Sequence, residues 1–233
     1  MRSPMQSAFL PTRLSLLASL ALTFGMIVWR VVSYAPLLSL RGAKSLIGEA
    51  AALLLCYGIV VAWPQPRGAG SFRPQFATVF GVAGGLIQSI HLLVERFCAL
   101  PQPWDGIVTL SFMLGTFLVW GYAGYRARGL GMSFFAGCLA ALWSAIVTMT
   151  IAVLVGSLLE FFLAPIPLET MNAWAEFQRS GWKDLSAFSI ANTIDEVSTH
   201  LLVGPIVACF FGPLGYALHM LTRQTHRKQD LRS

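Results

Sequence analysis

Long apolar segments without a charged residue recur along this chain. The clearest lie at 107–125, 129–159 and 201–222, and none of them contains Asp, Glu, Lys or Arg. A helix rises about 1.5 Å per residue, so roughly 20 apolar residues cross a hydrocarbon layer about 30 Å thick. Each of these segments approaches or exceeds that length. The pattern therefore predicts membrane-spanning helices.

The same pattern predicts an all-α bundle of six transmembrane helices. We place the spans at about 13–33, 45–63, 75–95, 106–125, 132–160 and 195–221. Connections rich in Pro and Gly separate them, as turn-forming residues do. A more polar segment, about 165–190, precedes the last span, and its apolar residues recur at helical spacing. We expect it to form a short amphipathic helix on the outer surface, within one integral membrane domain over 1–233.

Composition excludes a soluble domain. Hydrophobic residues make up 56% of the chain and charged residues only 11%, whereas a typical soluble domain carries about 25% charged residues. The net charge of +6 comes from basic residues in short loops and at the termini. Such residues set the orientation of a membrane protein, so nucleic acid is not expected as a partner. The expected partner is the lipid bilayer.

The distribution of basic residues predicts the orientation. Ten of the 16 Lys and Arg residues fall on the side that holds both termini. The positive-inside rule then places both termini in the cytoplasm, with the chain in the cell (inner or plasma) membrane. Trp120, Tyr122 and Tyr125 are expected at the inner interface and Trp104 at the outer one, as aromatic belts are.

Acidic residues are distributed in the opposite way. Nine of the ten fall on the outer half: Glu49, Glu95, Asp105, Glu160, Glu169, Glu176, Asp184, Asp195 and Glu196. Acidic residues contribute little to topology. Their asymmetry indicates either an outer vestibule that attracts cations or chance in a small sample.

Glu49 and His91 are the ionisable groups that the predicted spans place deepest in the membrane. Beyond Glu49 the second span reaches only to Trp63, about 21 Å, which is too short to cross the hydrocarbon alone. The third span draws His91 inward to a similar depth. Because consecutive antiparallel spans are usually neighbours, we expect Glu49 and His91 to be in contact. Snorkelling or local water is the alternative.

A polar stripe follows the third span. Gln88, His91 and Glu95 stand at i, i+3 and i+7, which is one face of a helix. Lipid cannot satisfy these groups, so the stripe should face the interior of the bundle. Gly81 and Gly85 have the small-xxx-small spacing that is typical of close helix packing.

A metal site is an alternative prediction from some of the same residues. A histidine and a glutamate stand four residues apart in the third and sixth spans: His91, Glu95, Glu196 and His200. If these antiparallel helices touch, the four side chains could hold Zn, Fe or Mn, as His and Glu do in other bundles. Glu49 and Glu160 could add a ligand or a general base. Such pairs also arise by chance, which leaves hydrogen-bonded, solvated or proton-handling residues as alternatives.

The last span begins with Asp195, Glu196 and His200. The 201–221 segment alone measures about 31 Å, so these groups can remain at the outer interface. Asn192 or Asp195 would then cap the helix.

Two Gly–Pro pairs, at 204–205 and 212–213, lie within the same span. Each proline frees a carbonyl that a neighbour, water or an ion must satisfy. Interrupted helices are typical of transporter sites, but kinks at proline are also ordinary in membrane helices.

Three functional classes follow. The first is binding or transport of a small solute or ion through an outward-facing pocket that handles protons, formed by Glu49, Gln88, His91, Glu95, Glu160, Glu196 and His200. The second is a membrane-embedded, metal-dependent enzyme of a hydrolase-like kind, with His and Glu ligands. The third is an accessory protein without a site. We favour the first. The sequence leaves open an oligomer or partner subunits, and it contains no Walker or GxSxG motif.

Overall fold

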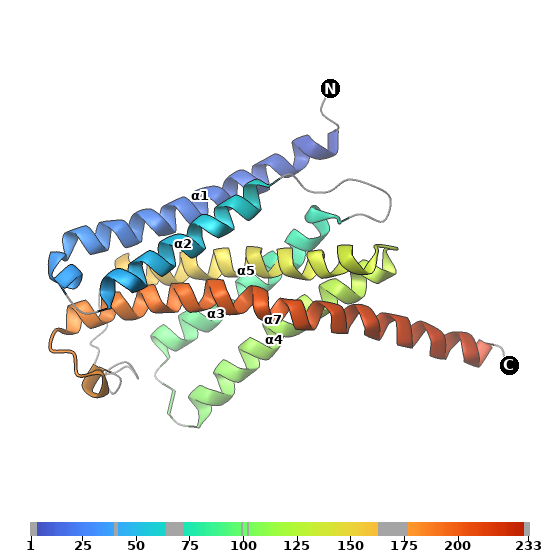
Figure 1. Cartoon of the computed structure of the whole chain (residues 1–233). Coiled ribbons are helices and arrows are strands. Elements are labelled where there is room, and N and C mark those ends of the chain that lie inside the picture. Colours follow the sequence, from blue (N-terminus) through green and yellow to red (C-terminus); the bar gives the residue numbers. More distant parts are fainter. Residues whose placement is uncertain are drawn as a thin grey trace.

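The computed structural model is all-helical over the residues it describes, which are 4–39, 42–63, 72–98, 100–101, 103–162 and 177–230 (Figure 1). Side chains at 4–9, 39, 96, 162 and 224–230 lie outside that description. The helices are α1 (Pro4–Ser33), the short 3₁₀ helix η1 (Ala35–Ser39), α2 (Ala43–Ala62), α3 (Pro74–Phe97), α4 (Trp104–Gly129), α5 (Phe134–Phe162) and α7 (Leu185–Asp230). Six of them are long and apolar enough to cross a membrane, which confirms the six predicted spans.

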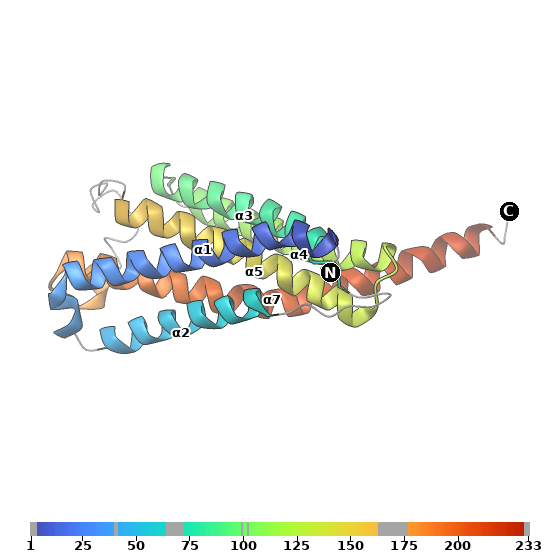
Figure 2. The same ribbon diagram turned by 90° about the horizontal axis from the view of Figure 1, so that it is seen from above.

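The helices form a four-helix core with two flanking helices. In the core, α5 packs against α3, α4 and α7, and α4 also packs against α7. The flanking helix α1 packs on α5, and α2 packs on α7 and α1. Figure 2 shows α3 on one side of α5 and α2 on the other. The consecutive spans α2 and α3 are therefore not packing partners, contrary to our expectation.

The α3–α5 interface is built from small residues and hydroxyls. A Cβ placed on Gly81 would collide with Val147 and would lie 2.8 Å from the carbonyl oxygen of Ser144. The close approach lets the Ser144 hydroxyl donate to the Ala77 carbonyl at 2.8 Å and the Thr148 hydroxyl donate to the Gly81 carbonyl at 3.0 Å. In lipid, such packing and interhelical hydrogen bonds hold helices together. The predicted packing role of the glycine pair is confirmed.

The prediction for the position of Trp120 was wrong. We expected it at the inner interface, but it is fully buried between helices. Its indole Nε1 donates to the hydroxyl of Thr148 at 3.2 Å, and its ring packs on Phe117. A buried tryptophan needs such an acceptor, and α5 supplies one. Tyr122 and Trp104, in contrast, are exposed.

The last helix begins ten residues earlier than predicted. Asp184 caps it, because its Oδ1 accepts a hydrogen bond from the backbone N–H of Ala187 at 3.1 Å. The prediction that Asn192 or Asp195 forms the cap was wrong. Of the predicted amphipathic segment at 165–190, residues 165–176 lie outside the described residues, and residues 185–190 belong to α7. At 46 residues, α7 measures about 69 Å, and it extends past the other helices (Figure 1).

Neither proline interrupts α7. The helix is continuous through Pro205 and Pro213. Pro205 has no N–H for the carbonyl of Leu201, four residues earlier. The hydroxyl of Tyr57, on α2, donates to that carbonyl at 2.8 Å and is itself buried. The first Gly–Pro pair is therefore a packing feature, and a neighbouring helix satisfies the carbonyl that it frees.

The two ends of the bundle differ in charge. We call the acidic end the one where α3 and α5 end and α4 and α7 begin, which carries Glu95, Asp105, Glu160 and Asp184. We call the basic end the opposite one, where α4 ends and α5 begins, which carries Arg126, Arg128 and Arg223. Figure 1 shows the two ends far apart along the long axis of the bundle.

Candidate functional site

A small pocket lies between α3, α5 and α7 near the acidic end. The space open to the centre of a water molecule is about 20 Å³, which is enough for about one or two waters. It is lined by Leu92, Ala152, Val153, Gly156, Ser157, Thr193, Glu196, Val197 and His200. Leu92 and Gly156 lie about 8–9 Å from the ends of their helices. The pocket is thus more than one helical turn inside the bundle.

The wall on α5 carries an unsatisfied hydroxyl. Ser157 is fully buried, and its Oγ has no hydrogen-bond partner among the described residues. Leaving a buried polar group unpaired costs about 1–3 kcal/mol. Because most buried polar groups in proteins are paired, an orphan at a pocket wall marks a place where a ligand or water would bind.

The wall on α7 carries a carboxylate and an imidazole. Glu196 accepts a hydrogen bond from Asn192 Nδ2 at 2.7 Å, which holds its side chain one turn along the helix. His200 Nδ1 lies 2.8 Å from the carbonyl oxygen of Glu196. A carbonyl only accepts, so Nδ1 carries the proton and Nε2 of the neutral ring is an acceptor.

Thr193 completes the polar lining. Its hydroxyl donates to the carbonyl of Ser189 at 3.0 Å, so its remaining capacity is that of an acceptor. The pocket therefore offers oxygen and nitrogen lone pairs from Glu196, His200 and Thr193, with the Ser157 hydroxyl free to orient either way. A donor or a cation suits this lining better than an anion does.

His91 and Gln88 face α4 instead of the pocket. Both are buried, as predicted for the polar stripe, but Glu95, its third residue, is exposed, so the stripe faces the interior only in part. The Gln88 amide donates to the Thr116 hydroxyl at 2.9 Å. His91 stacks on Phe112, and its Nε2 lies 3.3 Å from the Thr109 hydroxyl. Its Nδ1 is buried without a partner in the described part of the chain.

His91 still belongs to the surroundings of the pocket. It is close enough to Glu95, His200 and Asp105 to interact with them electrostatically. The Glu95 carboxylate lies 4.0 Å from His91 Nε2 and is largely exposed. Leu92, the next residue along α3, lines the pocket. His91 is therefore adjacent to the site but turned toward α4.

The structure does not bring Glu49 and His91 together. The buried face of α2 consists of Ala43, Ala50, Leu54, Tyr57 and Val61. Glu49 falls outside that face and is exposed. Because α2 packs on α7 and α1 while α3 packs on α5 and α4, the two residues belong to different interfaces. Glu160 is half-buried near the end of α5, beyond the pocket lining.

The predicted metal ligands are not gathered into a metal-binding group. Within the described residues, no three or more His, Cys, Asp or Glu side chains are placed to hold a metal ion. His91 and Glu95 are on α3, whereas Glu196 and His200 are on α7, and these helices are opposite members of the four-helix core. His91 is turned toward α4, and His200 Nδ1 is taken by a carbonyl.

Two polar residues of the pocket were missed from the sequence. Ser157 and Thr193 are hydroxyl residues in apolar helices, where most hydroxyls bond to a carbonyl of their own helix. Ser111 and Thr150 do so, for example. No sequence signal separates Ser157 from these, because its lack of a partner depends on the neighbouring helices.

Comparison with known proteins adds no family. No known protein family, curated protein or solved structure matches this chain.

Proposed function

We propose that this multi-pass membrane protein binds a small monovalent cation in the pocket between α3, α5 and α7. Binding would be the first step of the solute transport that the sequence predicts. The observation that carries the proposal is the lining of acceptor groups around a water-sized space, with the buried Ser157 hydroxyl unpaired at its wall.

The size and chemistry of the pocket limit which cations can bind in it. About 20 Å³ accommodates a particle of about the size of a water molecule. Ammonium has this size, and its N–H groups match the acceptors of Glu196, His200 and Thr193. Sodium and potassium are alternatives of the same class, since hard oxygen ligands suit them. Organic cations with several carbon substituents are too large for this conformation.

The acidic end supports the same class of ligand. Glu95, Asp105 and Asp195 lie at or near the end of the bundle at which the pocket is located. A cleft lined by one sign of charge raises the local concentration of the opposite ion. Asp195 neighbours Glu196 in the sequence but does not line the pocket.

Ligand-induced stabilisation tests the proposal. A ligand that binds only the folded state stabilises it by RT ln(1 + [L]/Kd). The thermal unfolding of the purified protein would be followed in ammonium, sodium or potassium chloride. Tetraethylammonium chloride, which is too large for the pocket, keeps the ionic strength constant. We expect at least one small cation to raise the Tm in a saturable manner.

The Ser157→Ala variant provides the control for the site. Ser157 is buried without a partner in the described part of the chain, so its replacement by alanine should not destabilise the protein in the absence of cation. It should weaken the cation-induced shift. Absence of a saturable shift for all three small cations would contradict the proposal, as would an equal shift in Ser157→Ala.

A further inference from the structure

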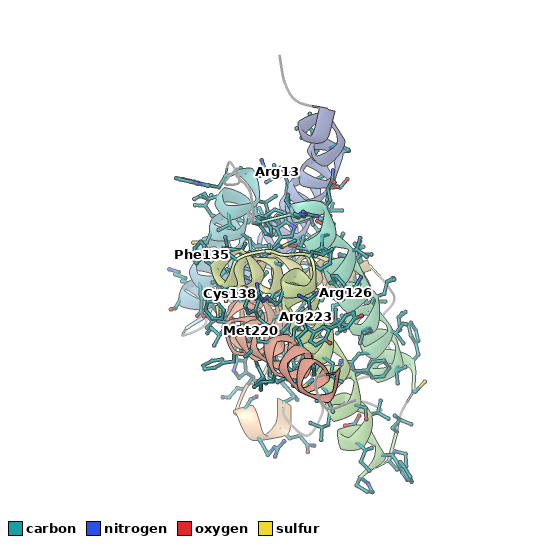
Figure 3. The ribbon with its side chains drawn as sticks, turned by 90° about the vertical axis from the view of Figure 1, so that its right-hand side faces the viewer. Arg13, Arg126, Phe135, Cys138, Met220 and Arg223 are labelled. Atoms are coloured by element: carbon teal, nitrogen blue, oxygen red, sulfur yellow. The ribbon has the colours of Figure 1, made fainter. Side chains whose placement is uncertain are left out.

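A second cluster of unusual side chains lies at the basic end, away from the pocket. Arg126 and Arg128 stand on the last turn of α4, and Arg223 stands on α7. Arg126 and Arg223 are exposed, and Figure 3 shows both on the same part of this end of the bundle. The guanidinium of Arg128 lies over the ring of Tyr216, 5.6 Å from its centroid, which fixes its position.

His219 lies at the centre of this cluster. Its ring meets the edge of Tyr125, with 4.5 Å between the centroids. A Cβ on Gly129 would lie only 3.2 Å from His219 Cε1, so the missing side chain leaves room for the ring. All three arginines are close enough to interact electrostatically with it.

Neither nitrogen of His219 has a hydrogen-bond partner. Both Nδ1 and Nε2 are buried and unpaired among the described residues. No ion pair connects Arg126, Arg128 or Arg223 to a carboxylate in the described part of the chain. Helix packing alone does not account for an unsatisfied imidazole beside three positive charges. A negatively charged acceptor would satisfy both.

We infer that Arg126, Arg128, Arg223 and His219 bind the phosphate group of an anionic phospholipid between the end of α4 and the part of α7 where its apolar span ends. Guanidinium groups match phosphate oxygens in a two-pronged geometry, and a histidine N–H adds a donor. The ends of membrane helices lie at the level of lipid headgroups. Basic pockets between helices at that level are suited to such headgroups.

Lipid binding by the purified protein tests this inference. The full-length protein would be freed of bound lipid in detergent and titrated with phosphatidylglycerol or phosphatidylcholine. Native mass spectrometry would measure the bound fraction. We expect phosphatidylglycerol to bind more tightly. The double variant Arg126→Gln/Arg223→Gln should bind it about tenfold more weakly, while its affinity for phosphatidylcholine stays the same.

Arg13→Gln is the matched control. Arg13 lies on α1 at the same end, and Figure 3 shows it apart from Arg126 and Arg223. It donates to the carbonyl of Trp63, and it is not among the three arginines that interact electrostatically with His219. This variant should keep the affinity for phosphatidylglycerol. An equal loss in both variants would overturn the inference, because it would indicate net charge alone.

Inorganic phosphate distinguishes a lipid from a soluble anion. If phosphate alone displaces phosphatidylglycerol at millimolar concentration, the site serves a soluble ligand and the lipid assignment is wrong. Should the double variant not fold, Arg126→Lys/Arg223→Lys replaces it, because it keeps the charge and loses the two-pronged geometry. An affinity equal to wild type in that variant would also contradict the inference.

Discussion

The hydroxyl of Tyr57 donates a hydrogen bond to the carbonyl of Leu201, 2.8 Å away on a different helix. That carbonyl is the one that Pro205 leaves without a partner in α7. One contact thus links the flanking helix α2 to α7 and satisfies a carbonyl that neighbours the pocket residue His200.

Removal of this hydroxyl should destabilise the protein. We expect Tyr57→Phe to lower the free energy of unfolding by about 1–2 kcal/mol, because the carbonyl of Leu201 would be buried and unpaired. In a Pro205→Ala background, the new N–H can satisfy the same carbonyl, so Tyr57→Phe should cost much less. Unfolding measurements in detergent for all four proteins give the coupling. An equal cost in both backgrounds would show that the contact is unrelated to Pro205.

A methyl group at Gly81 should disrupt the α3–α5 interface. Gly81→Ala would collide with Val147 and approach the carbonyl of Ser144, so we expect a loss of about 1–3 kcal/mol. Gly48→Ala is the matched control, since a Cβ there meets no atom within 4 Å. Alanine at that helical position should be neutral or stabilising by up to about 1 kcal/mol. Similar losses in both variants would contradict the packing described for α3 and α5.

The pH dependence of stability should reflect Asp184. The hydroxyl of Tyr34 and the N–H groups of Ala187 and Ser186 bind its carboxylate and lower its pKa. These interactions stabilise the fold above the ordinary aspartate pKa of about 3.9 and are lost as the pH falls through the lower value of the folded state. The same contact raises the pKa of Tyr34, so on the alkaline side stability is lost only as the pH rises through that raised value.

The Asp184→Asn variant isolates the contribution of the ionised Asp184 carboxylate to stability in acid. The amide can still cap the helix, but it carries no charge to titrate. The Tm difference between wild type and this variant should therefore be constant near neutrality and shrink in acid. A difference for Asp184→Asn that does not depend on pH would contradict the prediction.

A native cysteine reports the orientation of the bundle. Cys98 follows α3 at the acidic end and is exposed. The positive-inside rule predicts that this end lies outside the cell, and if so a membrane-impermeant thiol reagent labels Cys98 in intact cells. Cys98→Ser should abolish that labelling, because Cys56, Cys138 and Cys209 lie within apolar spans. Labelling of Cys98 only after the membrane is permeabilised would reverse the predicted orientation.

The spans were predictable from the sequence because the pattern depends on the length of apolar segments. The neighbours of each helix were not. We expected α2 to pack beside α3. Instead α3 packs against α5, which begins 37 residues after α3 ends. The buried face of α2 follows Ala50, Leu54 and Tyr57, which are apolar or aromatic like the rest of that helix. The hydrophobicity of the sequence therefore does not show which face of α2 is buried.

The site was predictable in part. Glu196 and His200, two of the residues that the sequence singled out, line the small pocket, and His91 and Gln88 are buried. The predicted contact between Glu49 and His91 was wrong, because it assumed that α2 and α3 are adjacent. Ser157 was missed because only the three-dimensional packing leaves its hydroxyl without a partner.

The measurement that tests the proposed cation site most directly compares two neighbouring carboxylates. Glu196 lines the pocket and Asp195 does not, so Glu196→Gln and Asp195→Asn remove the same charge one residue apart. The stabilisation by ammonium chloride would be titrated in both variants at constant ionic strength. We predict that Asp195→Asn keeps the wild-type shift in Tm and that Glu196→Gln loses most of it. Equal shifts in the two variants would contradict a cation site in this pocket.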